Sequence, residues 1–120
     1  MAVILIVEDE FFIRQNAEWA MEDLGHSTLV ATDLIEALAH LAAPLHIDAL
    51  FVDIRLSALP FGGYDVANQA IVLRPGLRVL YTSGRPLTAA MTEGFVGGAR
   101  FLQKPYSADQ LSESVGELLH

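Results

Sequence analysis

Charged residues follow several short apolar runs of this sequence, at the points where each run ends. They are Glu8, Asp9, Glu10, Asp53 and Lys104, the last being the only lysine in the chain. Carboxylate oxygens are the ligands that Mg²⁺ prefers, and this ion often shares its remaining positions between water and a phosphate. Carboxylates brought together repel one another and raise their pKa values unless a cation intervenes. If these residues meet, we expect a metal site with an ammonium group beside it.

The residues are brought together only if the apolar runs are neighbouring strands of one sheet. The runs are Val3–Val7, Ser27–Ala31, Ala49–Val52, Leu77–Tyr81 and Arg100–Leu102. They are nearly continuously apolar or β-branched, as expected for parallel strands covered on both faces. Amphipathic segments lie between them, which predicts an α/β fold of five βα units. Right-handed crossovers favour a flavodoxin-like, doubly wound sheet with strand order 2-1-3-4-5.

The helix signals agree with this architecture. The segment 11–25 places Phe12, Trp19 and Leu24 near one helical stripe and ends at a glycine. Asp33 is a candidate N-cap, and Ser107 with Gln110 has capping-box spacing. The glycine-rich stretch EGFVGGARF precedes the fifth run, so we expect the fourth helix to be short or mobile.

In this strand order the carboxyl ends of the strands form one edge, where ligands bind in such sheets. Thr82, Ser83 and Gly84 follow the fourth run, so they join the acids and Lys104 there. Each residue alone has an ordinary structural explanation. An Asp at a strand end often caps a helix, acids favour the positive end of a helix, and a lysine is usually solvated. Their combination at one edge is what favours a functional site.

Composition excludes several other classes of protein. The chain has 120 residues, which fits a single domain over residues 1–120. A net charge of −8 argues against direct nucleic-acid binding, because phosphate contacts need Lys and Arg. The absence of cysteine fits a reducing cytoplasm and excludes thiolate metal sites. The four histidines have no ligand spacing, and the N-terminus has neither a signal peptide nor a membrane span. We therefore expect a cytoplasmic protein without membrane or nucleic-acid partners.

Four motifs in this order resemble the receiver domain of response regulators in two-component signalling, over essentially the whole chain. The motifs are LIVEDE, LFVDIR, LYTSG and FLQKPY. The resemblance implies that Asp53 is the phosphoacceptor. It also implies a Mg²⁺ or Mn²⁺ site formed by Glu8, Asp9, Asp53 and the backbone carbonyl of Arg55.

The same resemblance gives roles to the later motifs. Thr82 and the backbone N–H of Ser83 would bind the phosphoryl group, and Lys104 would pair with one of its oxygens. The Lys104–Pro105 bond is expected to be cis. Phe101 would act with Thr82 as a switch for the surface formed by the fourth helix, fifth strand and fifth helix. Such a domain is not a conventional enzyme, because it catalyses only phosphorylation and dephosphorylation of its own aspartate.

The partners implied are a histidine kinase or a histidine phosphotransfer protein as donor, and a downstream protein partner. Phe11, Phe12 and Tyr106 are candidate contacts for the donor, although Phe12 is equally compatible with the core. A homodimer is possible. Two contexts fit the sequence: a single-domain regulator and a receiver from a larger hybrid kinase. The chain departs from the family in having Ser57 where proline is common and a longer loop, RLSALPFGGYD, after the phosphoacceptor.

Three other functions are alternatives to a phosphorylated receiver domain. A phosphatase of the haloacid-dehalogenase type needs a second acid two residues after its aspartate, where this chain has Arg55. A flavin-binding module would need a phosphate loop after the first strand, where three acids would repel a phosphate. The remaining alternative is a receiver-like interaction module that signals without phosphorylation.

Overall fold

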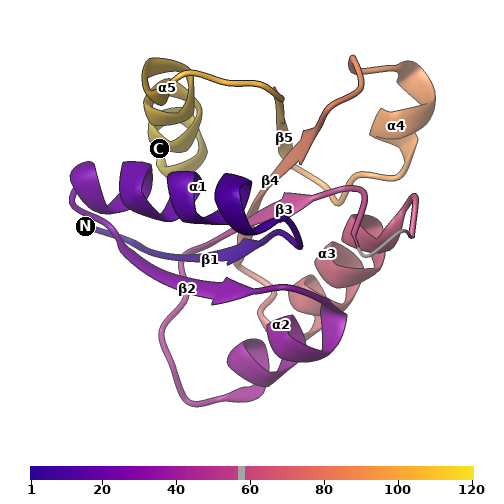
Figure 1. Cartoon of the computed structure of the whole chain (residues 1–120). Helices are drawn as coiled ribbons and strands as arrows, with labels where there is room; N and C mark the ends of the chain where they lie inside the picture. Colours follow the sequence, from indigo (N-terminus) through magenta and orange to yellow (C-terminus); the bar gives the residue numbers. More distant parts are fainter. Residues whose placement is uncertain (57–58) are drawn as a thin grey trace.

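A single parallel sheet with helices on both faces forms the protein, as the computed structural model of residues 1–56 and 59–120 shows (Figure 1). The strands are β1 (Val3–Val7), β2 (Ser27–Ala31), β3 (Ala49–Asp53), β4 (Arg78–Ser83) and β5 (Arg100–Gln103). Their order is β2-β1-β3-β4-β5, and every neighbouring pair is parallel. The α/β class and the flavodoxin-like strand order predicted from the apolar runs are confirmed.

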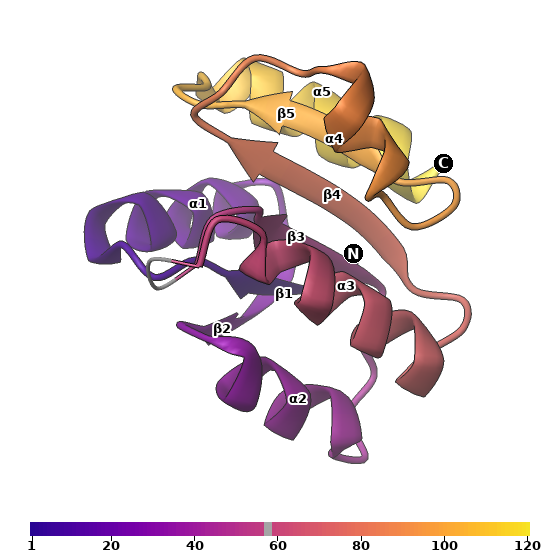
Figure 2. The same ribbon diagram turned by 90° about the vertical axis from the view of Figure 1, so that its right-hand side faces the viewer.

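The helices form the two outer layers. They are α1 (Phe11–Asp23), α2 (Leu34–Ala42), α3 (Gly62–Leu73), α4 (Ala89–Glu93) and α5 (Ala108–Leu119). Helices α1 and α5 cover one face of the sheet, while α2 and α3 cover the other (Figures 1 and 2). Helix α4 lies beyond β4 on the α3 side (Figure 2). This is the arrangement that right-handed βαβ crossovers produce around a switch point between β1 and β3.

The sheet divides the core into two apolar clusters. Leu5, Leu50 and Val79 belong to the cluster on the α2 and α3 side, and Ile6 and Phe51 belong to the cluster on the α1 and α5 side. All five residues of β3 are buried, because this strand has a neighbour on each side and helices on both faces. The last residue of this strand is Asp53, so its carboxylate is placed by a buried strand that is paired on both sides.

Local signals in the sequence set most helix ends. The side chain of Asp33 accepts a hydrogen bond from the backbone N–H of Glu36 at the start of α2. Ser107 and Gln110 form a complete capping box at the start of α5. Gly25 follows α1 with φ of 90°, a conformation that glycine adopts without a steric penalty. These predictions are confirmed.

Two expectations about element details are corrected. Phe12, Trp19 and Leu24 are all exposed, and α1 instead buries Ala17 and Met21 against the sheet. The expected fourth strand stopped at residue 81, whereas β4 continues to Ser83, because Thr82 pairs with Asp53 and Ser83 pairs with Gln103. The prediction of a short fourth helix is confirmed, since α4 has five residues.

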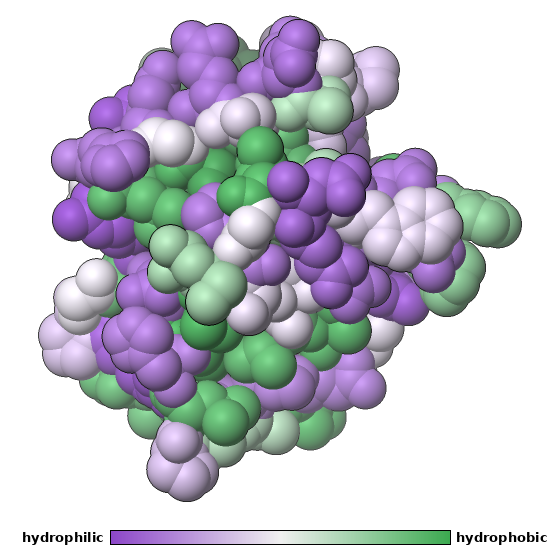
Figure 3. Space-filling model, turned by 90° about the vertical axis from the view of Figure 1, so that its left-hand side faces the viewer, coloured by the Kyte–Doolittle hydropathy of each residue, from purple (hydrophilic) through white to green (hydrophobic). Residues whose placement is uncertain are grey.

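The surface carries apolar residues without forming one continuous patch on the side that holds the N-terminus. Figure 3 shows this side, where hydrophobic areas are separated by hydrophilic residues. Isolated exposed apolar residues are normal on soluble domains. Among the residues that the structure describes, no helix has the length and apolar character needed to span a membrane.

Candidate functional site

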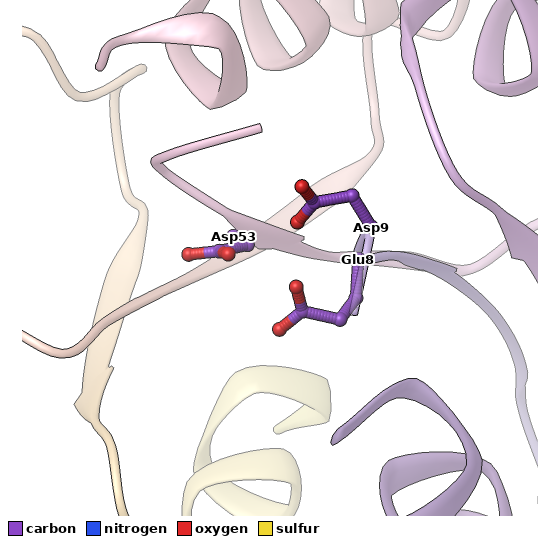
Figure 4. A group of neighbouring side chains, drawn as sticks. All are labelled: Glu8, Asp9 and Asp53. Atoms are coloured by element: carbon purple, nitrogen blue, oxygen red, sulfur yellow. The ribbon is translucent and has the colours of Figure 1, made fainter. Parts of the chain in front are cut away.

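Three carboxylates converge at the carboxyl ends of β1 and β3. Glu8 and Asp9 follow β1, and Asp53 ends β3 (Figure 4). One carboxylate oxygen of each lies within 4.8 Å of the others, so a single cation can contact all three. Glu8 and Asp53 are buried and Asp9 is exposed, so the cluster has a closed side and an open side. This arrangement fits a hard divalent cation that keeps some of its water ligands.

The only lysine of the chain bridges two of these acids. Lys104 Nζ donates to Glu8 Oε1 at 2.6 Å and to Asp53 Oδ2 at 3.0 Å. All three side chains are at most 16% exposed. The Lys104–Pro105 peptide bond is cis, and the backbone N–H of Lys104 donates to the carbonyl of Ser83 at 2.8 Å. Lys104 is therefore anchored at both ends, and its ammonium is directed at the acids rather than at solvent.

Burial and neighbouring charges shift the pKa values of Glu8 and Lys104. Burial raises the pKa of Glu8 to about 7, the charge of Asp53 adds to this rise, and the hydrogen bond from Lys104 opposes it. For Lys104, burial lowers the pKa, but its hydrogen bond to Glu8 and the charges of Glu8 and Asp53 outweigh burial and raise it. Three carboxylates and one ammonium leave a formal charge of −2 at this site when all are ionised. One divalent cation would neutralise it, so the donor set fits Mg²⁺.

The hydroxyl of Thr82 is buried at the same edge of the sheet. Its Oγ1 has no hydrogen-bond partner among the described residues, and Thr82 is only 2% exposed. A buried hydroxyl without a partner lowers the free energy of unfolding. The hydroxyl of Thr82 is therefore a candidate group for binding a ligand at this edge. Ser83 differs, because its hydroxyl accepts the backbone N–H of Arg85 at 3.1 Å and shapes the turn after β4.

The first turn of α3 packs directly on the backbone of Asp53. The N–H of Gly63 donates to the carbonyl of Ile54 at 2.7 Å. A Cβ added at Gly63 would lie 2.2 Å from the carbonyl oxygen of Asp53 and 2.7 Å from Cα of Ile54. No side chain can be accommodated at that distance. Ser57, the residue where proline is common in the family, lies outside the described residues.

A cleft of about 1200 Å³ opens above the acids. Glu8, Asp9, Asp53 and Lys104 line one part of it, and Arg55 is an exposed residue at its edge. Phe61, Tyr64 and Met91 line another part, so the acidic site continues into an apolar recess. The site is therefore accessible to a reactant even though two of its acids are buried.

One of the predicted site residues does not join the others. Phe101 pairs with Tyr81 in the sheet and packs in the apolar cluster on the α2 and α3 side. Thr82 instead borders a small gap lined by Phe51 and Tyr106, which belong to the cluster on the α1 and α5 side. The two proposed switch residues thus lie on opposite faces of the sheet, because neighbouring residues of a strand point in opposite directions.

Two contacts near the site, made by Arg14 and Tyr64, were not predicted from the sequence. Arg14 Nη1 donates to the carbonyl of Glu8 at 3.1 Å, and its guanidinium carbon lies 5.5 Å from the centre of the Phe11 ring. The Tyr64 hydroxyl donates to the carbonyl of Met91 in α4 at 3.2 Å. Burial raises the pKa of Tyr106, and the charges of Glu8 and Asp53 raise it further, so its hydroxyl stays protonated. A basic residue one turn after three acids was the only available signal for Arg14.

Comparison with known proteins agrees with this geometry. A family model described as the response regulator receiver domain matches residues 4–116. The chain belongs to the receiver-domain family of response regulators. This receiver is 28% identical over 117 residues to the response regulator MprA of Mycobacterium tuberculosis. The aligned region covers 97% of this chain and 50% of that relative. It therefore spans about half the length of the MprA relatives that it matches.

Two further similarities cover most of both chains. The receiver is 29% identical over 114 residues to the protein PilG of Pseudomonas aeruginosa, covering 90% of this chain and 80% of that relative. The crystal structure of a response regulator receiver protein from Sinorhizobium medicae superposes with a TM-score of 0.87 at 27% identity, covering 98% of this chain and 94% of the other. The receiver fold and family are therefore shown both by sequence and by structure.

Proposed function

We propose that Asp53 accepts a phosphoryl group and that the receiver, over residues 1–120, works in a two-component or phosphorelay system. The observation that carries this proposal is the meeting of five side chains at one sheet edge. Lys104 contacts Asp53 and Glu8, and Asp9 completes an acidic cluster. Thr82, near the end of the neighbouring strand β4, has a buried hydroxyl with no partner among the described residues. A structural role alone would not leave that hydroxyl buried without a partner.

Glu8, Asp9 and Asp53 would hold the metal, with the carbonyl of Arg55 as a further ligand. When bound, Mg²⁺ or Mn²⁺ would neutralise charge on the transferring phosphoryl group. The protein residues supply the rest. Lys104 would pair with a phosphoryl oxygen, and Thr82 with the N–H of Ser83 would donate hydrogen bonds to it. Because the donor set is fixed by strand ends, little rearrangement is needed when the reactant arrives.

The reaction is a displacement at phosphorus. A carboxylate oxygen of Asp53 forms a bond to phosphorus, while the bond from phosphorus to nitrogen of a phosphohistidine, or to oxygen of a small acyl phosphate, breaks. The leaving group keeps the electron pair of that bond. No general base is needed, because an ionised carboxylate is already a nucleophile. Water later hydrolyses the acyl phosphate, so the receiver catalyses only reactions of its own aspartate.

The donor would be a histidine kinase or a histidine phosphotransfer protein acting in the cytoplasm. Phe11 and Phe12 are 53% and 71% exposed, and they form an edge-to-face pair directly after the acids of the β1–α1 loop. An exposed apolar pair directly after these acids suits contact with a protein donor. Phosphorylation would then alter the surface of α4, β5 and α5 for a downstream protein or a second copy of the chain.

The test is phosphorylation by a small acyl phosphate with Mg²⁺, followed by intact mass measurement. We expect the wild-type protein to gain one phosphoryl group and Asp53→Asn to gain none. Asp65→Asn is a matched control, because Asp65 is exposed in the first turn of α3 and lies outside the cluster. A wild-type protein that gains no phosphoryl group from the acyl phosphate or from a kinase would favour the interaction module that signals without phosphorylation.

A further inference from the structure

The first turn of α3 and helix α4 are in direct contact. The Tyr64 hydroxyl, in the first turn of α3 after the long loop, donates to the carbonyl of Met91 in α4 at 3.2 Å. The Tyr64 ring also lies against Gly94, where an added Cβ would be 3.1 to 3.3 Å from three ring carbons. The glycine that ends α4 thus leaves room for this tyrosine. The first turn of α3 is therefore packed against the end of α4 through Tyr64.

The residue before Tyr64 touches the backbone of Asp53. Gly63 packs so closely on the Asp53 carbonyl that no Cβ fits between them, and its N–H binds the carbonyl of Ile54. Gly63 and Tyr64 are adjacent in one helical turn. A shift of the Asp53 backbone would therefore be transmitted through α3 to the hydroxyl that holds Met91, because packed backbone contacts are not readily compressed.

Helix α4 is weakly held and so is easy to move. It has five residues and none of them is buried. The Thr88 side chain caps its first turn by accepting the N–H of Met91. The carbonyl of Met91 accepts both the Tyr64 hydroxyl and the N–H of Gly94. Elements with few buried contacts open at low free energy, so loss of a single hydrogen bond should change the opening of this helix measurably.

The expected route through Thr82 and Phe101 is poorly placed to reach α4 alone. Thr82 borders a gap on the α1 and α5 side of the sheet, whereas α4 lies on the α3 side. Tyr64 lies on the correct side, with its ring centre 5.6 Å from Tyr81 and 6.1 Å from Phe95. Phe95 in turn stacks on Phe101 at 6.2 Å. These aromatic contacts join Tyr64 in α3 to the segment after α4.

We infer that Tyr64 is the positioning residue through which phosphorylation of Asp53 changes the position of α4. The inference rests on the proposed function, because it assumes that Asp53 is the phosphoacceptor. Tyr64 touches neither the acids nor the phosphoryl group in this role. It acts through Gly63 on one side and through the Met91 carbonyl on the other, so its loss should separate phosphorylation from its effect on α4.

The test compares wild-type protein with Tyr64→Phe, which removes the hydroxyl and keeps the ring. Amide hydrogen exchange of residues 91–96 is measured with and without a small acyl phosphate and Mg²⁺, and phosphoryl incorporation is followed by intact mass. In the wild-type protein we expect phosphorylation to change this exchange roughly fivefold, the effect of about one hydrogen bond. In Tyr64→Phe we expect the same phosphoryl incorporation as in the wild-type protein. The exchange rates of residues 91–96 should then differ by less than about twofold between the two states.

Tyr81→Phe is the matched control. The Tyr81 hydroxyl accepts the N–H of Val96 at 3.1 Å, so this variant also removes one hydroxyl contact from the same segment, without touching the loop at Asp53. We expect it to speed exchange near Val96 in both states and to keep the difference between them. If Tyr64→Phe keeps the full wild-type difference, the inference is overturned while the proposed function stands. If the wild-type protein gains no phosphoryl group, the proposed function fails and the inference fails with it.

Discussion

The ammonium of Lys104 lies 3.0 Å from Oδ2 of Asp53, although the two residues are 51 positions apart in the chain. Both belong to strand ends, with Asp53 closing β3 and Lys104 following β5, and β4 lies between them. The lysine reaches across the end of β4 to make this contact. Its second hydrogen bond, to Glu8, ties β5 to β1 as well. One side chain thus connects three segments of the acidic site.

Removing this ammonium should destabilise the metal-free protein. In Lys104→Met, two buried carboxylates lose their only described cationic partner, and loss of one member of a buried ion pair typically costs about 3–5 kcal/mol. Solvent access on the open side reduces this, so we expect about 2 kcal/mol lower free energy of unfolding in urea with a chelator.

Mg²⁺ should recover more stability in Lys104→Met than in the wild-type protein, because a cation would replace part of the lost charge. Arg100→Gln is the control, since Arg100 pairs with Glu117 on the surface with both side chains about half exposed. Exposed pairs contribute about 0–1 kcal/mol. Equal losses in the two variants would contradict the central role of Lys104.

Glu8 should make the metal-free protein less stable as pH rises. Its pKa is about 7 in the folded protein against 4.5 in the reference state, so the folded protein binds more protons between these values. Stability that comes from the protonated acid is therefore present below pH 4.5 and is lost progressively as pH rises to about 7. The loss should total about 1–3 kcal/mol.

The measurement for Glu8 is chemical unfolding from pH 4.5 to 8 in a chelator. Glu8→Gln removes the titration, so the difference in unfolding free energy between wild type and variant should grow in favour of the variant across this range. A difference that is independent of pH would show that Glu8 is ionised throughout. With saturating Mg²⁺ we expect the trend to reverse, since the metal binds the ionised acid.

The hydroxyl of Thr82 should lower the stability of the unphosphorylated protein. It is buried and has no partner among the described residues, so Thr82→Val removes an unsatisfied polar group while keeping the shape of the side chain. We expect the free energy of unfolding to rise by about 1 kcal/mol, and the rate of phosphorylation by an acyl phosphate to fall. A clear loss of stability would mean that the hydroxyl is already satisfied in the resting protein.

Gly63 should tolerate no side chain. An added Cβ would meet the backbone of Asp53 and Ile54 rather than a movable side chain, so Gly63→Ala must displace the loop or the phosphoacceptor. We expect a loss of more than about 2 kcal/mol in unfolding free energy, together with slower phosphorylation. Gly116→Ala is the control, because it lies in α5 with open space around it and should gain about 0.5–1 kcal/mol.

The strand order, the caps of α2 and α5 and the residues that meet at the strand ends could all be predicted from the amino-acid sequence. These features are local or depend on alternation along the chain: apolar runs predict buried strands, and Asp33 and Ser107 mark helix starts through their own hydrogen bonds. Because the carboxyl ends of parallel strands share one edge, the placement of Glu8, Asp53 and Lys104 followed from the strand order.

Which side chains contact one another could be seen only in the folded structure. Phe12 and Trp19 are apolar but exposed, because α1 needs only small and flexible residues, Ala17 and Met21, to pack on the sheet. The separation of Thr82 from Phe101 depends on sheet register, and the contact of Tyr64 with α4 depends on how two loops pack. Such relationships depend on sheet register and on the packing of side chains between elements, which the apolar pattern along the chain does not specify.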